Sequence, residues 1–236
     1  MAGPLTSPAA RRGAAAGLAE VLVIVALYIA LAHAAVHTFD ASALLPNALA
    51  VRERQVGGVF AVGALAQLGL LVLLACTWAR REVLEAVRST VRPASGRSWV
   101  IALSAAAIHI VVGVLFFLPD PQQVAEGSGT KAIAVLALPD AWTQEVMFRG
   151  YVMLRLARSG FRAPAQIAIG AVAFGAIHVG YLGESVWDAF WPLFGTITLG
   201  AVLGLSAAVS RGSLLPAVCA HALIIAALQP WLALAR

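Results

Sequence analysis

The chain has 236 residues, of which 61% are hydrophobic and 11% are charged, and its mean hydropathy is +0.89. Soluble domains carry about 25% charged residues, so this composition excludes an ordinary soluble domain and indicates a polytopic membrane protein. The formal net charge is +5, but the arginines lie at the ends of apolar segments and do not form one basic patch. This distribution favours membrane topology signals over nucleic-acid binding.

Seven hydrophobic segments follow one another along the chain, each close to the length of about 20 residues that a membrane-spanning helix needs. They lie at 14–36, 57–79, 98–118, 131–157, 164–182, 188–210 and 213–235. They leave no room for a soluble domain. We therefore predict an all-α polytopic membrane protein with about seven transmembrane helices, forming a single integral-membrane domain over residues 1–236.

The arginines predict the orientation of the chain in the membrane. A cytoplasmic N-terminus gives the cytoplasmic side Arg11, Arg12, Arg80, Arg81, Arg88, Arg92, Arg97, Arg155, Arg158, Arg162 and Arg211, and leaves Arg52, Arg54, Lys131 and Arg236 outside. The positive-inside rule selects this orientation. Abundant arginine, alanine and glycine beside scarce lysine indicate a GC-rich bacterial genome, so we expect a multi-pass protein of the bacterial plasma membrane.

Three local patterns qualify this scheme. The first segment, with Arg11-Arg12 before it and Ala32-His33-Ala34 near its end, also resembles a signal peptide, but its apolar run is longer than usual, so we favour a membrane span. The stretch Arg80–Arg97 mixes charges with apolar residues and is expected to form a short amphipathic helix on the cytoplasmic face. Cys76 and Cys219 lie in apolar runs without metal-ligand spacing, which indicates structural roles.

The fourth segment carries a polar cluster, Gln144-Glu145-Val146-Met147-Phe148-Arg149-Gly150. Ionisable groups inside a membrane indicate a functional site by default, because burying them unpaired costs several kcal/mol. Glu145 and Arg149 are spaced i,i+4 and share one helix face, whereas Gln144 points about 100° away. Pro139 predicts a kink or restart before this cluster, with freed carbonyls that could line a polar cavity.

The fifth and seventh segments each carry one histidine, His178 and His221. Counted from the cytoplasmic helix ends at 1.5 Å per residue, Glu145 lies about 18 Å deep, His178 about 21 Å and His221 about 12 Å. We therefore predict one polar site between helices 4, 5 and 7. The residues support three interpretations: a structural ion pair, metal-free water activation with an oxyanion donor, or a zinc site of Glu145, His178 and His221.

These stretches resemble the CPBP family of CAAX-processing and bacteriocin-processing intramembrane proteases, also called the ABI family. Its pattern is Glu-Glu-x-x-x-Arg, then Phe-x-x-x-His, then His-x-x-x-Asn or Asp, each on a separate membrane helix. The matching stretches here are Gln144–Gly150, Phe174–His178 and His221–Ile225, within a protease core over about residues 99–228.

The resemblance implies a role for each matching residue. It implies that His178 activates water, that His221 donates to the oxyanion, and that Glu145 and Arg149 organise the site. It also favours a metal-free site with no cofactor. Two residues depart from the pattern: Gln144 stands where the family has its first Glu, and Ile225 stands where it has Asn or Asp. Loss of one oxyanion donor typically costs about 100-fold to 1000-fold in rate.

Three functions therefore stay open. In an active protease Glu145 serves as base with His178, and Gln144 positions the substrate or the oxyanion. In an inactive pseudoprotease Glu145 pairs fully with Arg149, and the protein acts as a membrane scaffold, binding protein or immunity protein. A transport cavity is the third, although no pair of broken helices in matching halves supports it. We favour the protease, acting on a membrane-associated peptide or protein, with no nucleic-acid partner.

Overall fold

The computed structural model describes residues 8–38, 51–117, 130–178, 186–210 and 212–234. Over these residues the fold is all-helical, as predicted, and contains no strand. The helices are α1 (Pro8–Thr38), α2 (Val51–Cys76), α3 (Arg80–Ser89), α4 (Gly96–Phe117), α6 (Thr130–Glu145), η2 (Val146–Val152), α7 (Met153–Arg158), α8 (Ala163–Ala176), α9 (Val186–Val209) and α10 (Leu215–Leu234). The short helix α3 lies within the stretch expected to be amphipathic, and it buries Val83 and Ala86.

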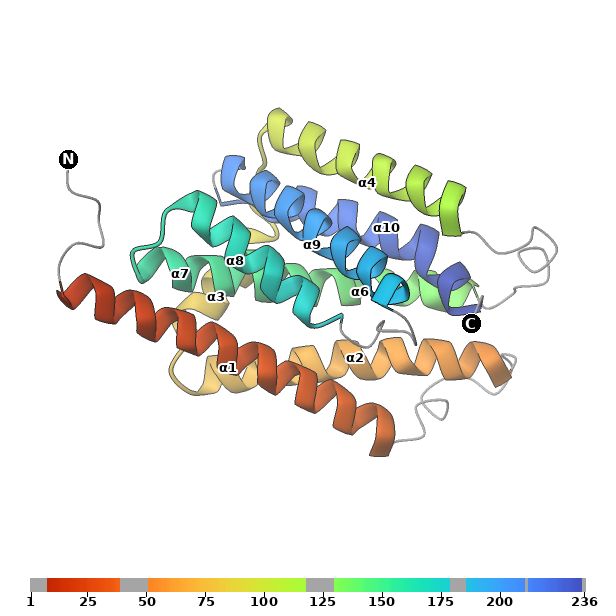
Figure 1. Ribbon diagram of the computed structural model, residues 1–236, viewed down its shortest axis with the longest axis horizontal. Coiled ribbons are helices and arrows are strands. Elements are labelled where there is room, and N and C mark those ends of the chain that lie inside the picture. The colour runs from red at the N-terminus through yellow and green to blue at the C-terminus, as the bar shows by residue number, and fades with distance from the viewer. Residues whose placement is uncertain (1–7, 39–50, 118–129, 179–185, 211, 235–236) are drawn as a thin grey trace.

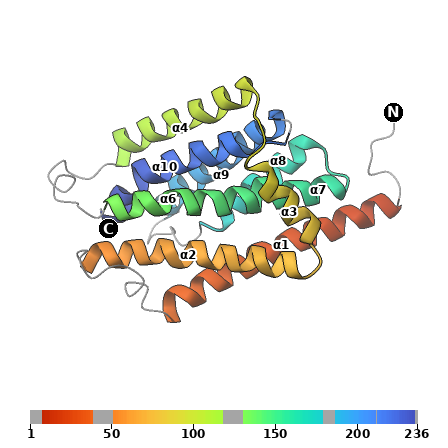
Figure 2. The ribbon, with the colours of Figure 1, turned by 180° about the vertical axis from the view of Figure 1, so that it is seen from behind.

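The long helices run side by side along the long axis of one bundle (Figure 1). Helix α6 occupies a central place, because it packs against α2 on one side and α10 on the other (Figure 2). Helix α10 also packs against α4, and α9 packs against both α4 and α8. The polar cluster of α6 is thereby enclosed by helices from both halves of the chain.

Apolar helices long enough to cross a membrane occur twice in the described part of the chain, at Gly13–Leu31 and Gly96–Leu115. Shorter apolar helical stretches lie at Ala61–Cys76, Ala163–Ala176, Leu193–Val209 and Leu215–Leu228. The apolar helices agree with a membrane protein. The number of about seven transmembrane helices stays a prediction.

Helix α1 is joined to the far end of the central helix by one carboxylate. Glu20 accepts hydrogen bonds from the Tyr151 hydroxyl at 2.5 Å, from Arg155 Nε at 2.6 Å and from Trp78 Nε1 at 3.0 Å. Three donors from two other parts of the chain converge on this side chain. Glu20 therefore fixes α1 against η2, α7 and the end of α2.

Helix α7 ends in a tight turn that reverses the chain into α8. Gly160 has a φ of 88°, its N–H donates to the Ala157 carbonyl, and the Phe161 N–H donates to the Leu156 carbonyl. These two bonds form a Schellman motif, which favours glycine at the left-handed position. Because the turn is short, α8 returns directly beside the central helix, and this brings Phe174 and His178 towards the polar cluster.

Candidate functional site

The central helix changes its geometry at the polar cluster. Helix α6 runs without interruption through Pro139 to Glu145, so no restart occurs at the proline. The next seven residues, Val146–Val152, form a π-helix in which every residue is buried. A π-helical turn inside a longer helix often marks a functional site. The π-helix begins directly after Glu145 and includes Arg149.

Glu145 links the central helix to α10. Its side chain is fully buried, and its Oε1 lies 2.8 Å from His221 Nδ1 and 3.0 Å from Arg149 Nη1. An ionised carboxylate can only accept, so His221 donates from Nδ1. The predicted i,i+4 pair is thus present, and one histidine shares the same carboxylate oxygen.

Phe174 is the packing centre of the site. The Arg149 guanidinium lies 4.2 Å from the centroid of the Phe174 ring, a cation–π contact. The same ring meets the rings of His178 and His221 in edge-to-face contacts with centroid distances of 4.8 Å and 5.5 Å. Phe174 of α8 therefore contacts both histidines and the arginine through one aromatic ring.

His178 follows the end of α8, and its ring orientation is set by that helix end. Its Nδ1 lies 2.7 Å from the Phe174 carbonyl oxygen. Helix α8 ends at Ala176, and the last carbonyls of a helix lack backbone partners, so the side chain takes up one of them. Because a carbonyl only accepts, Nδ1 carries the proton, and Nε2 carries the lone pair in the neutral ring. This is the tautomer that a base requires.

Ile225 contributes an apolar contact instead of a hydrogen bond. It is buried and packs with Ala141 of α6 and with Ala222 and Ala226 of its own helix. The side chain lies one helical turn beyond His221 on α10. The structure therefore supplies no polar group at this position, in keeping with the departure seen in the sequence.

A second polar group in the same helix escaped the sequence analysis. Asp140 is 5% exposed, and its Oδ2 accepts a 3.1 Å hydrogen bond from Gln144 Nε2. Its Oδ1 accepts another, also of 3.1 Å, from Gln67 Nε2 of α2. Gln67 also donates to the Tyr28 hydroxyl and accepts from Thr143. The i,i+4 spacing of Asp140 and Gln144 was a signal that could have revealed this pair.

Four buried atoms at the site lack a hydrogen-bond partner within the described residues: Gln144 Oε1, Glu145 Oε2 and Arg149 Nη1 and Nη2. The Arg149 Nη1 contact with Glu145 is close enough for an ion pair, but it is not aligned as a hydrogen bond. Buried polar atoms are satisfied in the large majority of cases. Their concentration on three neighbouring side chains therefore indicates a site that binds a polar group.

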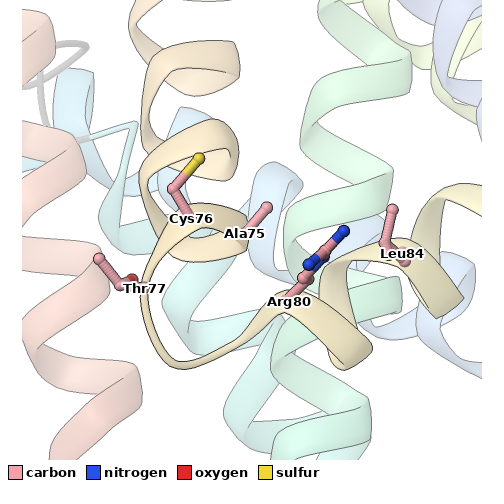
Figure 3. A pocket seen from close by; sticks show the side chains of 5 residues that line it. All are labelled: Ala75, Cys76, Thr77, Arg80 and Leu84. Atoms are coloured by element: carbon pink, nitrogen blue, oxygen red, sulfur yellow. The ribbon is translucent and has the colours of Figure 1, made fainter.

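No group of three His, Cys, Asp or Glu side chains that could hold a metal ion occurs among the described residues. Glu145 and His221 bond directly to each other. A surface pocket of about 470 Å³ lies elsewhere, at the junction of α2 and α3 (Figure 3). It is lined by Ala75, Cys76, Thr77, Arg80 and Leu84, and so by none of the predicted site residues.

Comparison with known proteins places one segment in a family. Residues 127–227 match the family described as type II CAAX prenyl endopeptidase Rce1-like. This segment contains all seven predicted site residues, from Gln144 to Ile225. No curated protein and no solved structure matches the chain.

Proposed function

Since residues 127–227 match the Rce1-like family, in agreement with the CPBP resemblance, we propose that the chain is an intramembrane endopeptidase. The reaction is hydrolysis of a peptide bond in a membrane-associated peptide or protein by an activated water. The description of the family suggests a prenylated C-terminal segment as the first substrate class to test. We also propose that the seven hydrophobic segments predicted from the sequence cross a bacterial plasma membrane.

The observation that carries this proposal is the set of unpartnered polar atoms beside two histidines. Gln144 Oε1 and Glu145 Oε2 can accept hydrogen bonds from a water molecule, and the Arg149 Nη atoms can donate. A purely structural ion pair would be expected to satisfy these atoms internally. A site that binds water and a carbonyl group needs acceptors and donors of this kind.

The roles follow from the hydrogen bonds. His178 Nε2 takes one proton from water while the second O–H is shared between Glu145 Oε2 and Gln144 Oε1, and the oxygen attacks the carbonyl carbon. The carbonyl oxygen becomes an oxyanion that His221, as the doubly protonated imidazolium, stabilises by donating from Nε2–H, while its Nδ1–H stays bonded to the Glu145 carboxylate. The proton held by His178 then passes to the leaving amine, which completes the cleavage.

A second candidate function is an inactive membrane-binding or scaffold protein. The specific observation in its favour is that Glu145 Oε1 is engaged by both Arg149 and His221. With Ile225 in place of a polar residue, the site also lacks one donor. Such a protein would keep the buried network as a structural element, and removal of His178 would leave its partner binding unchanged.

The test is cleavage by the purified protein in liposomes. The probes are an internally quenched farnesylated peptide ending in Cys-aliphatic-aliphatic-X, the same peptide without the lipid, and native membranes probed by labelling new N-termini. We expect His178→Ala and Glu145→Gln to lower cleavage by about 100-fold or more. The matched control is Ser206→Ala, which removes a buried hydroxyl bonded to the Ser98 carbonyl between α9 and α4. No cleavage of any probe by the wild type would overturn the protease assignment and favour the scaffold.

A further inference from the structure

We infer that Asp140 is a positioning residue of the site, which holds the Gln144 amide so that its oxygen faces the reacting water. The inference rests on the proposed peptidase function for its effect on rate, but the pairing of the two side chains can be tested without it. Asp140, one helical turn before Gln144, is then the second carboxylate of the site beside Glu145.

The geometry of the pair fixes the orientation of the amide. Gln144 Nε2 donates to Asp140 Oδ2 at 3.1 Å, and Gln144 Oε1 is the atom left without a partner among the described residues. An amide has one end that donates and one that accepts, and a carboxylate only accepts. Asp140 therefore selects which end of Gln144 faces the site, and that end is a buried acceptor, like the carboxylate that the family has at this position.

Asp140 is itself held from another helix. Gln67 Nε2 donates to Asp140 Oδ1 at 3.1 Å and to the Tyr28 hydroxyl at 2.8 Å. Thr143 donates to Gln67 Oε1 at 2.7 Å, which fixes the orientation of the Gln67 amide as well. These bonds tie α1 and α2, which lie outside residues 127–227, to the centre of the site. In the described part of the chain Asp140 forms no ion pair, so its partners are neutral donors.

This arrangement reverses an expectation based on the family pattern alone. Glu at position 144 would restore the family motif, yet in this chain it would stand about 3 Å from the Asp140 carboxylate. Two carboxyl groups this close cannot both ionise easily, and one proton is then shared between them. Gln144→Glu alone should therefore weaken the site, whereas the exchange Asp140→Asn with Gln144→Glu keeps one carboxylate and one amide.

The test is a double-mutant cycle with Asp140→Asn, Gln144→Glu and the exchange variant carrying both, beside wild type and the Ser206→Ala control. Each protein is reconstituted in liposomes, and kcat and KM are measured with the farnesylated quenched peptide. We expect Asp140→Asn to lower kcat on the order of 100-fold with KM unchanged, because a misoriented amide misplaces the water. Gln144→Glu should also lower kcat, and the exchange should recover it to within about tenfold of wild type.

Two results would overturn the inference: an unchanged kcat in Asp140→Asn, or an exchange variant whose loss equals the product of the two single losses. If wild type cleaves no probe, the proposed function fails, and the melting temperatures of the same proteins decide about the pair. Gln144→Glu should then melt below wild type and the exchange should regain most of the shift. Additive shifts in melting temperature would overturn the pairing itself.

Discussion

At the scale of single residues, the choice of variant at Glu145 matters because one oxygen of this carboxylate serves two partners. Replacing Glu145 by Ala would leave Arg149 and His221 buried without their shared acceptor. Breaking a buried ion pair in this way costs about 3–5 kcal/mol. The amide of Glu145→Gln keeps one acceptor oxygen for these donors. Loss of cleavage in the Gln variant can therefore be separated from loss of folding, which the Ala variant would not allow.

We expect cleavage to be independent of a bound metal ion. Glu145 and His221, two of the three candidate zinc ligands, use Oε1 and Nδ1 for a direct 2.8 Å bond, and His178 uses Nδ1 for the Phe174 carbonyl. The measurement is cleavage after incubation with 1,10-phenanthroline, together with the zinc content of the purified protein. Activity that disappears on chelation and returns with added Zn²⁺ would contradict the metal-free proposal.

Some relations within the site could be predicted from the sequence and one could not. The i,i+4 spacing of Glu145 and Arg149 predicts their contact, and similar depths of Glu145, His178 and His221 predict that three helices converge there. The structure brings Arg149, His178 and His221 together around Phe174, and Glu145 contacts Arg149 and His221. The partner of Asp140 depends on Gln67, 73 residues earlier in the chain. No local pattern indicates which polar residue of α2 faces the central helix.

At the scale of helices, the π-helix Val146–Val152 depends on close contact with α3. A Cβ atom added at Gly150 would lie 2.4 Å from the Ala86 Cβ and 3.2 Å from its Cα. We expect Gly150→Ala to destabilise the protein by about 1–3 kcal/mol, because α3 must move away as a unit. Thermal unfolding of the purified protein measures this effect, and Ala86→Gly in the same chain should restore part of the loss.

The matched control is Gly69→Ala on α2, where an added Cβ meets nothing within 4 Å. Alanine is favoured over glycine inside a helix by about 1 kcal/mol, so this variant should be as stable as wild type or slightly more stable. Equal unfolding temperatures for Gly150→Ala and wild type would contradict the role of this contact in holding α3 against the π-helix.

The π-helix lay outside what the sequence could predict. Proline has a known effect on helices, so Pro139 was the natural place to expect a disturbance. In the structure the helix continues through Pro139, and the wider turn begins only after Glu145. Propensity does not separate α from π geometry over seven residues. The packing of Gly150 on Ala86 and of Phe148 on Phe174 involves segments far apart in the chain.

At the scale of the whole molecule, the described turns that carry the arginines gather at one end of the bundle. The α2–α3, α3–α4, α7–α8 and α9–α10 connections lie at the same end as the start of α1, and α10 finishes at the opposite end (Figure 1). Arg158 of α7 forms ion pairs with Glu82 and Glu85 of α3 at this end. The positive-inside rule predicts that this end of the bundle faces the cytoplasm.

The predicted topology can be measured with single cysteines. In a chain carrying Cys76→Ser and Cys219→Ser, we expect Ala94→Cys, between α3 and α4, to be protected from a membrane-impermeant maleimide in intact cells. We expect Ser42→Cys, between the first two predicted spans, to react without permeabilisation. Moving Lys or Arg residues across the membrane is strongly disfavoured, and Arg80, Arg88 and Arg97 flank Ala94. Labelling of Ala94→Cys but not of Ser42→Cys in intact cells would indicate the opposite orientation. Labelling of both cysteines from outside would mean that α2 does not cross the membrane. Since α2 carries Gln67, that result would also mean that the hydrogen bond between Gln67 and Asp140 does not lie inside the membrane.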